Sequence, residues 1–208
     1  MLVTALEKEP RGSGVRVQVD GGPFATVSPA DVAELGLRPG AALDDARAAI
    51  LERRAEAFAA RTVALRMLGY RALPGREIAR RLSRKGHARD VADGVVEALR
   101  GEGLVNDAEF ARHYTRTRAS ARRLGPARIQ ADLRRLGVDE QVAAEAIRET
   151  LEREHIEPGQ LLHEAAARKL REMAGLDRTA QRRRLKAFLL RRGFSSGDVV
   201  AVLRETLG

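Results

Sequence analysis

Three glycines at nearly regular intervals divide most of the chain into similar segments. Gly86, Gly137 and Gly193 lie 51 and 56 residues apart. A leucine precedes each glycine by four residues, and another aliphatic residue precedes it by eight: Leu82, Leu133 and Leu189, then Ile78, Ile129 and Leu185. Spacings of four and eight place these side chains on one face of a helix. The chain therefore contains an internal repeat, which is typical of a tandem array of small helical units.

Each repeat is expected to consist of three helices. The glycine suits a left-handed position that ends the central helix. An upstream helix is expected over 60–71, 107–122 and 160–174, and a downstream amphipathic helix over 91–99, 142–151 and 199–207. The resulting repeats cover 60–106, 107–159 and 160–208. Units this small cannot bury their apolar faces alone, so we expect them to pack on one another or on a partner, in an elongated arrangement.

The first 42 residues contain the only β pattern in the chain. Apolar and polar residues alternate over 15–19, the sequence Asp-Gly-Gly at 20–22 predicts a turn, and 24–27 is expected to be the returning strand. An isolated hairpin is only marginally stable in water, so this one should lean on a neighbouring helix.

Helical patterns follow the hairpin. Ser28 and Pro29 are typical of a helix start, and Gly36 would end that short helix. One long helix is predicted from about 43 to 68, and its first part, 43–59, connects the N-terminal module to the first repeat. The predicted fold class is thus mainly all-α, with a small N-terminal β-hairpin.

The sequence offers no catalytic or metal-binding motif. It has no cysteine, which excludes disulfides, a thiol nucleophile and thiolate-bound metal. Phosphate-loop, dinucleotide-binding, zinc-protease and nucleophile-elbow motifs are also absent. The four histidines are scattered, and His155 and His163 have no third ligand in register. We therefore expect a protein that is not an enzyme and that holds no cofactor and no metal.

Hydropathy argues against a membrane protein. No segment approaches eighteen consecutive apolar residues, and the first fourteen residues lack the apolar run of a signal peptide. We expect a cytoplasmic protein with no membrane partner.

Positive charge is the strongest functional signal. There are 38 Lys and Arg against 29 Asp and Glu, which gives a net charge of +9 and favours an anionic partner. Two segments, 111–131 and 178–197, contain no acidic residue at all. These segments and the residues beside them supply the candidate binding set: Arg112, Arg116, Arg118, Arg122, Arg123, Arg128, Arg134, Arg135, Arg182, Arg183, Lys186, Arg191 and Arg192. Arginine suits such contacts because its planar group grips phosphate or carboxylate with two parallel hydrogen bonds.

The helix over 107–122 allows a more detailed prediction. A buried stripe is expected at Phe110, Tyr114, Thr117 and Ala121. Arg112, Arg116 and Arg123 would then share an outward face, with Arg118 and Arg122 on its flank.

The residues of the repeats resemble those of a known family. The resemblance rests on ordered positions over about 60–208: Glu77-Ile78, Leu82, Lys85-Gly86, Leu99, 103–107 (Gly-Leu-Val-Asn-Asp), Phe110-Ala111, Tyr114, Gly125-Pro126, Arg128-Ile129, Leu133, Gly137-Val138 and 188–194 (Phe-Leu-Leu-Arg-Arg-Gly-Phe). This pattern resembles the RecX family of modulators of the recombinase RecA.

That resemblance implies a partner and a function. It implies a regulator that lies in the helical groove of the RecA–DNA filament and inhibits RecA, thereby modulating recombination and DNA repair. We expect a monomer, with weak, sequence-indifferent binding to single- and double-stranded DNA by itself.

A second function remains open from the residues alone. A basic helical protein can also bind DNA directly, as a helix-turn-helix or architectural factor. Against this alternative, no predicted helix carries base-reading Asn or Gln residues in a dimer-like context.

Overall fold

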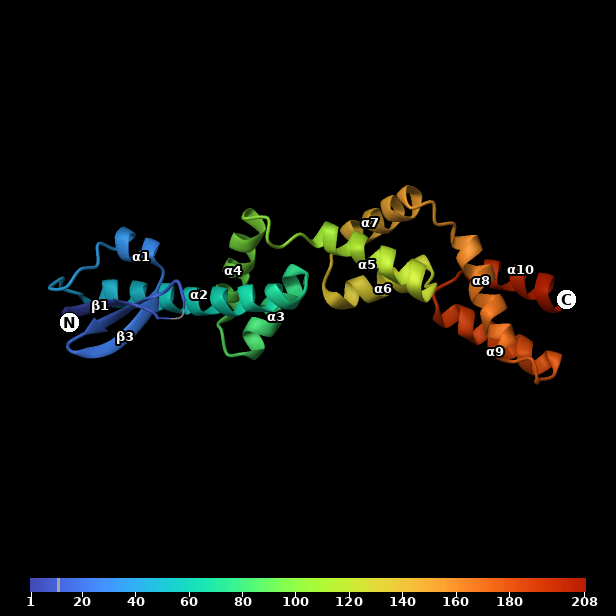
Figure 1. The fold of residues 1–208 in the computed structure, drawn as a ribbon, viewed down its shortest axis with the longest axis horizontal. Coiled ribbons are helices and arrows are strands. Elements are labelled where there is room, and N and C mark those ends of the chain that lie inside the picture. Colours follow the sequence, from blue (N-terminus) through green and yellow to red (C-terminus); the bar gives the residue numbers. More distant parts are fainter. Residues whose placement is uncertain (11) are drawn as a thin grey trace. The chain divides into compact units, whose positions relative to one another are not determined.

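The computed structural model describes residues 1–10 and 12–208, which form three strands and ten helices (Figure 1). The chain divides into two compact units. The first contains Met1–Leu73 and Glu77–Val105, and the second contains Pro74–Arg76 and Asn106–Gly208. No helix in the described part of the chain is long and apolar enough to cross a membrane.

The N-terminal module is a three-stranded antiparallel sheet in the order β1-β2-β3. Strands β2 (Val15–Val19) and β3 (Gly22–Val27) are the predicted hairpin. Strand β1 (Val3–Lys8) was not predicted, so the two-stranded expectation was incomplete. Its burial is irregular and it ends in two exposed charged residues, because it lies at the edge of the sheet and β2 is its one partner strand. Such an edge strand lacks the alternation that marks a central strand.

A long helix supports this sheet, as predicted. Helix α1 (Pro29–Glu34) is capped by Ser28, whose side chain and that of Asp31 bond each other's backbone N–H groups. Helix α2 (Asp45–Tyr70) packs along β3, and its Leu51 is fully buried in the core beneath the sheet (Figure 1). Asp31 also pairs with Arg54 of α2 at 3.1 Å, which fixes α1 to that helix.

The C-terminal half of α2 belongs to the first three-helix repeat, with α3 (Gly75–Arg84) and α4 (Arg89–Gly101). Ala60 and Ala64 of α2 pack there with Ile78, Leu82 and Leu99, all of them fully buried. Small residues on α2 allow the other helices to approach it closely.

The second unit holds two repeats with a common core. Its helices are α5 (Asp107–Arg122), α6 (Pro126–Leu136), α7 (Glu140–Arg153), α8 (Pro158–Arg171), α9 (Arg178–Arg191) and α10 (Ser196–Leu207). One continuous apolar cluster runs from Ala111 of α5 to Leu203 of α10. The prediction that repeats pack on one another is therefore confirmed for this pair.

The repeat glycines have the predicted backbone conformation. Gly86, Gly137 and Gly193 have φ of 96°, 95° and 82°. In each copy the N–H of the next residue donates to the carbonyl of the leucine four positions before the glycine: His87 to Leu82, Val138 to Leu133 and Phe194 to Leu189, at 3.2, 3.0 and 3.4 Å. This is the hydrogen bond of a Schellman-type helix end, and it turns the chain at the same point in all three repeats.

The predicted buried stripe of α5 was wrong in part. Phe110 and Tyr114 are only half-buried, while Thr117 and Ala121 are exposed. The buried residues are instead small ones: Ala111, Thr115 and Ala119. Helix α7 packs on α5 more extensively than any other helix does, and small buried residues on α5 allow such a close approach.

The backbone of Arg128 packs directly against Gly193, whereas no described part of the chain packs against Gly86 in this way. A Cβ at Gly193 would fall on the backbone nitrogen of Arg128, whereas one at Gly86 would meet open space. We therefore expect Gly86→Ala to cost about 1–2 kcal/mol of folding free energy, from left-handed strain alone. Gly193→Ala should cost clearly more because the backbone itself must move. Urea unfolding of both variants checks this, and equal losses would contradict the close approach.

His163 links α8 to α10 and makes this contact depend on pH. Its ring nitrogens lie 2.8 Å from the carbonyl of Gly159 and 2.9 Å from the carboxylate of Glu205. The Glu205 hydrogen bond is the main reason that the pKa of His163 is raised, with the Gly159 bond adding to it. A raised pKa in the folded state means that this stabilisation is complete below about pH 6.5, the unfolded value. It is lost as pH rises through the folded pKa.

An NMR titration of the histidine ring protons checks the assignment. Glu205→Gln should lower the pKa of His163, whereas Glu152→Gln, which removes an acid paired with Arg148 on α7, should leave it unchanged. Identical titration curves for the parent and Glu205→Gln would show that the contact does not form in solution.

Candidate anion-binding cleft

Part of the predicted basic surface is already neutralised within the protein. Arg112, Arg116 and Arg123, expected to face outward together, are each only about a third to two-fifths exposed. Each pairs with a glutamate further along the chain: Arg112 with Glu149 at 3.6 Å, Arg116 with Glu154 at 2.9 Å and Arg123 with Glu164 at 2.7 Å. The outward-face prediction was therefore wrong, since these arginines connect α5 to the segments packed beside it.

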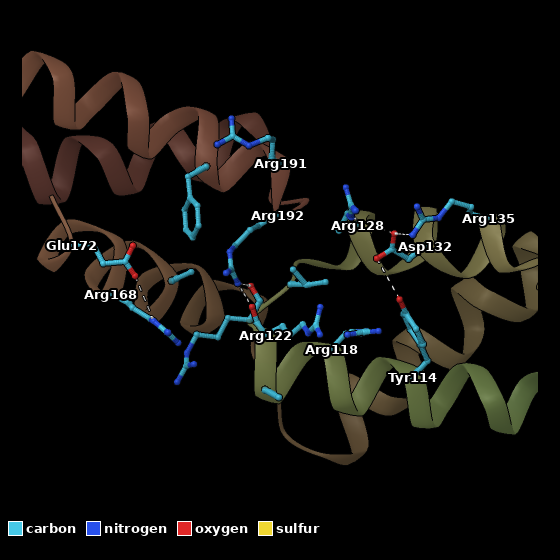
Figure 2. A pocket seen from close by; sticks show the side chains of 15 residues that line it. Tyr114, Arg118, Arg122, Arg128, Asp132, Arg135, Arg168, Glu172, Arg191 and Arg192 are labelled. Carbon is cyan, nitrogen blue, oxygen red and sulfur yellow. Dashed lines mark hydrogen bonds and ion pairs between the residues drawn. The ribbon is translucent and has the colours of Figure 1, made fainter. Parts of the chain in front are cut away.

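The two repeats of the second unit meet at the ends of α5 and α9. The N–H of Gly125 donates to the carbonyl of Arg192 at 2.8 Å. The Arg192 guanidinium returns the contact by donating to the carbonyls of Arg122 and Arg123, which end α5 (Figure 2). It also lies 4.6 Å from the ring centre of Phe188. The Arg192 side chain therefore makes two kinds of contact in this joint. Its N–H groups donate hydrogen bonds to α5, and the flat face of its guanidinium group lies over Phe188.

Beside this joint lies a cleft of about 680 Å³, walled by α5, α6, α8 and α9 (Figure 2). Eight arginines and only two carboxylates line it: Arg118, Arg122, Arg123, Arg128, Arg135, Arg168, Arg191 and Arg192, with Asp132 and Glu172. The pKa of Arg192 is lowered, chiefly by burial and further by the charges of Arg168 and Arg123. The cleft thus concentrates positive charge beyond what its own carboxylates balance, which suits an anionic ligand.

Asp132 positions the arginines of one wall. This carboxylate is only 11% exposed and lies 3.3 Å from both Arg128 and Arg135. The Tyr114 hydroxyl donates to its other oxygen at 3.4 Å, as Figure 2 shows. One buried acid therefore holds two guanidinium groups and a tyrosine of the neighbouring helix in place.

Cations lie over the aromatic rings of the cleft. Tyr114 stacks on Phe110, with 6.0 Å between ring centres, and the Arg118 guanidinium lies 4.7 Å from the Tyr114 centre. Phe188 has both Arg192 and the Lys169 ammonium near its ring. The rings serve to orient cations.

The structure divides the predicted binding residues into two groups. Those that line the cleft are Arg118, Arg122, Arg123, Arg128, Arg135, Arg191 and Arg192. Those that lie elsewhere are Arg112, Arg116, Arg134, Arg182, Arg183 and Lys186, the last four exposed on α6 and α9. Within the described residues, the side chains of Arg122 and Arg191 have no acidic partner within ion-pair distance.

Sequence reasoning missed several lining residues: Tyr114 as a cleft residue, Asp132, Arg168, Glu172 and Phe188. Arg168 does not lie in a segment free of acids, because Glu164 and Glu172 flank it in the sequence. The cluster Arg168, Lys169 and Arg171 in the last turn of α8 was the available signal.

The described part of the chain shows no candidate metal site. No group of three or more His, Asp or Glu side chains there could hold a metal ion. The structure has the features of a binding protein built from three-helix repeats, whose polar side chains converge on an arginine-lined cleft.

Family models identify the repeats. Models of the first, second and third three-helix domains of RecX match residues 60–99, 106–147 and 157–203. The chain belongs to the RecX family, and it is accordingly a regulatory protein rather than an enzyme.

Relatives agree with this assignment. The regulatory protein RecX of Amycolatopsis mediterranei (strain U-32) is 34% identical over 148 residues, which is 71% of this chain and 83% of the relative. That of Halorhodospira halophila (strain DSM 244 / SL1) is 38% identical over 146 residues, or 69% and 85% of the two chains.

Solved structures show the same fold. A crystal structure of a regulatory protein RecX matches with a TM-score of 0.79 over 98% of both chains at 20% identity. That of RecX from Lactobacillus salivarius matches with a TM-score of 0.61, covering 72% of this chain and 96% of the other, at 21% identity. The first match spans the N-terminal sheet as well as the repeats.

The joint between the repeats predicts that Arg192 and Arg191 differ in their tolerance of substitution. Arg192→Lys keeps the charge but removes the planar fork and its stacking on Phe188, so we expect a loss of about 1 kcal/mol in unfolding free energy. Arg191→Lys, its exposed neighbour, should stay within about 0.5 kcal/mol of the parent. Denaturant unfolding followed by circular dichroism measures these free energies of unfolding. Equal stability of the two variants would show that the Arg192 side chain does not stabilise the contact between the repeats.

Proposed function

We propose that this protein binds the RecA–DNA filament and inhibits RecA, with the cleft of the second unit as part of its contact surface. Membership of the RecX family supports RecA as the target. The observation that supports this contact surface is that eight arginines and only two carboxylates line the same cleft. A filament of protein and DNA presents the phosphates that such a cleft would bind.

Inhibition requires more than binding. A regulator shifts a filament toward an inactive state only if it binds that state more tightly than the active one. We propose that the protein acts as a cytoplasmic monomer, and that its two coupled repeats contact the filament together. The rigid joint at Arg192 supports this, because it keeps the arginines of α5 and α6 in a constant arrangement with those of α8 and α9.

RecA's DNA-dependent ATP turnover provides the direct test. Amounts of the protein below those of RecA should lower the turnover rate and suppress strand exchange. Unchanged turnover with excess protein would overturn the proposed function. Tight, salt-insensitive binding to one duplex sequence would instead favour the helix-turn-helix alternative.

Two matched double variants test where the contact lies. Arg122 and Arg191 have no acidic partner to lose, so replacing both by Ala should leave the fold intact. Inhibition should then weaken roughly tenfold, at about 0.7 kcal/mol for each lost contact. Replacing Arg182 and Arg183, exposed on α9 away from the cleft, removes the same charge and should have the smaller effect. The reverse order would place the contact on the outer face of α9.

A further inference from the structure

We propose that the cleft between the second and third repeats binds consecutive phosphates of a nucleic-acid strand, and that Glu172 competes with those phosphates for the cations beside it, Arg168 and Lys169. This deepens the proposed function and rests on it for the source of the strand. The basis is the arrangement of charge in the cleft and in a second hollow that continues from it.

The first observation is the extent of the basic surface. A second, more open hollow of about 830 Å³ shares Arg123, Arg168 and Glu172 with the cleft. It adds Arg171 and also Glu164, the carboxylate that pairs with Arg123. A single small anion would occupy one of these hollows. A polymer that carries a charge on every unit can follow both, and the phosphodiester backbone is such a polymer.

The second observation concerns what the cleft recognises. Base stacking needs an uncovered aromatic face, but cations already lie over Tyr114 and Phe188, and Tyr114 also stacks on Phe110. A base could stack only by displacing an arginine or a lysine. The cleft is therefore suited to phosphates and not to bases, and its binding should not depend on base identity.

The third observation is that Glu172 occupies the place of an anion. Its carboxylate lies 2.8 Å from the Lys169 ammonium. It lies 3.8 Å from Arg168, as Figure 2 shows for these two side chains. Lys169 lowers the pKa of Glu172 most, and Arg168 and Arg192 add to the effect. The carboxylate is half-exposed at the junction of the two hollows, so an incoming phosphate can replace it.

Asp132 has a different role from Glu172. It is nearly buried and bonds to side chains of both α5 and α6, so it belongs to the wall of the cleft. Neutralising Asp132 would loosen the arginines that it holds, whereas neutralising Glu172 would release arginine and lysine for a ligand. The two acids of the cleft should therefore affect binding in opposite directions.

Fluorescence anisotropy of a labelled oligothymidylate with the full-length protein, in the absence of RecA, tests the proposal. Glu172→Gln should tighten binding roughly two- to fivefold, because a competing surface ion pair of up to about 1 kcal/mol is removed. The matched control is Glu152→Gln, which changes the net charge equally but removes an acid that pairs with Arg148 on α7. Arg168→Ala should weaken binding and lower the salt dependence by about 0.7 in log–log slope, one phosphate contact.

Two further probes fix the ligand class. An oligonucleotide of the same length without bases should bind as the oligothymidylate does, because it carries the same phosphates. A polyglutamate peptide of equal charge should bind much more weakly. Equal effects of Glu172→Gln and Glu152→Gln would overturn the proposal, as would loss of binding without bases. Polyglutamate binding as tight as DNA binding would also overturn it and identify an acidic protein segment as the ligand.

RecA assays on the same proteins separate this proposal from the broader one. If the protein inhibits RecA but does not bind bare oligonucleotides, the phosphate site is wrong and the regulatory function stands. If it binds oligonucleotides as expected but leaves RecA turnover unchanged, the site stands and the proposed function is wrong.

Discussion

The second unit depends on a close approach of two backbones that only glycine permits. Gly125 begins the turn into α6, and a Cβ there would lie 2.5 Å from the carbonyl oxygen of Gly193. The same approach brings the N–H of Gly125 to the carbonyl of Arg192 and the Arg192 side chain to the end of α5. Because α5 and α9 meet there, arginines from both repeats line one cleft. The charge pattern of the site is thus a consequence of the backbone packing.

The parts of the fold that were predictable are those whose signals are local. A glycine, a leucine four residues earlier and an aliphatic residue eight earlier define a helix and its end within one short segment. That local rule located all three repeats. Strand β1 has no such signal, because its apolar and polar residues do not alternate regularly. The large side chains of α5 were misleading for a related reason: they pack at the edge of the interface, and small residues fill its centre.

The electrostatics were less predictable, because ion-pair partners lie far apart in the sequence. Glu149, Glu154 and Glu164 are 37 to 41 residues away from the arginines that they neutralise. A segment without acids therefore does not identify a surface without acids. Arg168 shows the opposite error, since acids beside it in the sequence concealed its place among the other arginines of the cleft. Net charge indicates an anionic partner, but the fold decides which cations remain available to it.

The shared core of the second and third repeats has a consequence for biosynthesis. Ala111 of α5 and Leu203 of α10 belong to the same apolar cluster, although more than ninety residues separate them. The part of this cluster at the boundary between the two repeats is therefore completed only when the third repeat has emerged from the ribosome. Until then apolar residues at that boundary stay exposed to solvent, and exposed apolar surface of this kind is what chaperones bind on nascent chains. The arginine-lined cleft itself forms only after both repeats have been synthesised, because its walls come from both of them.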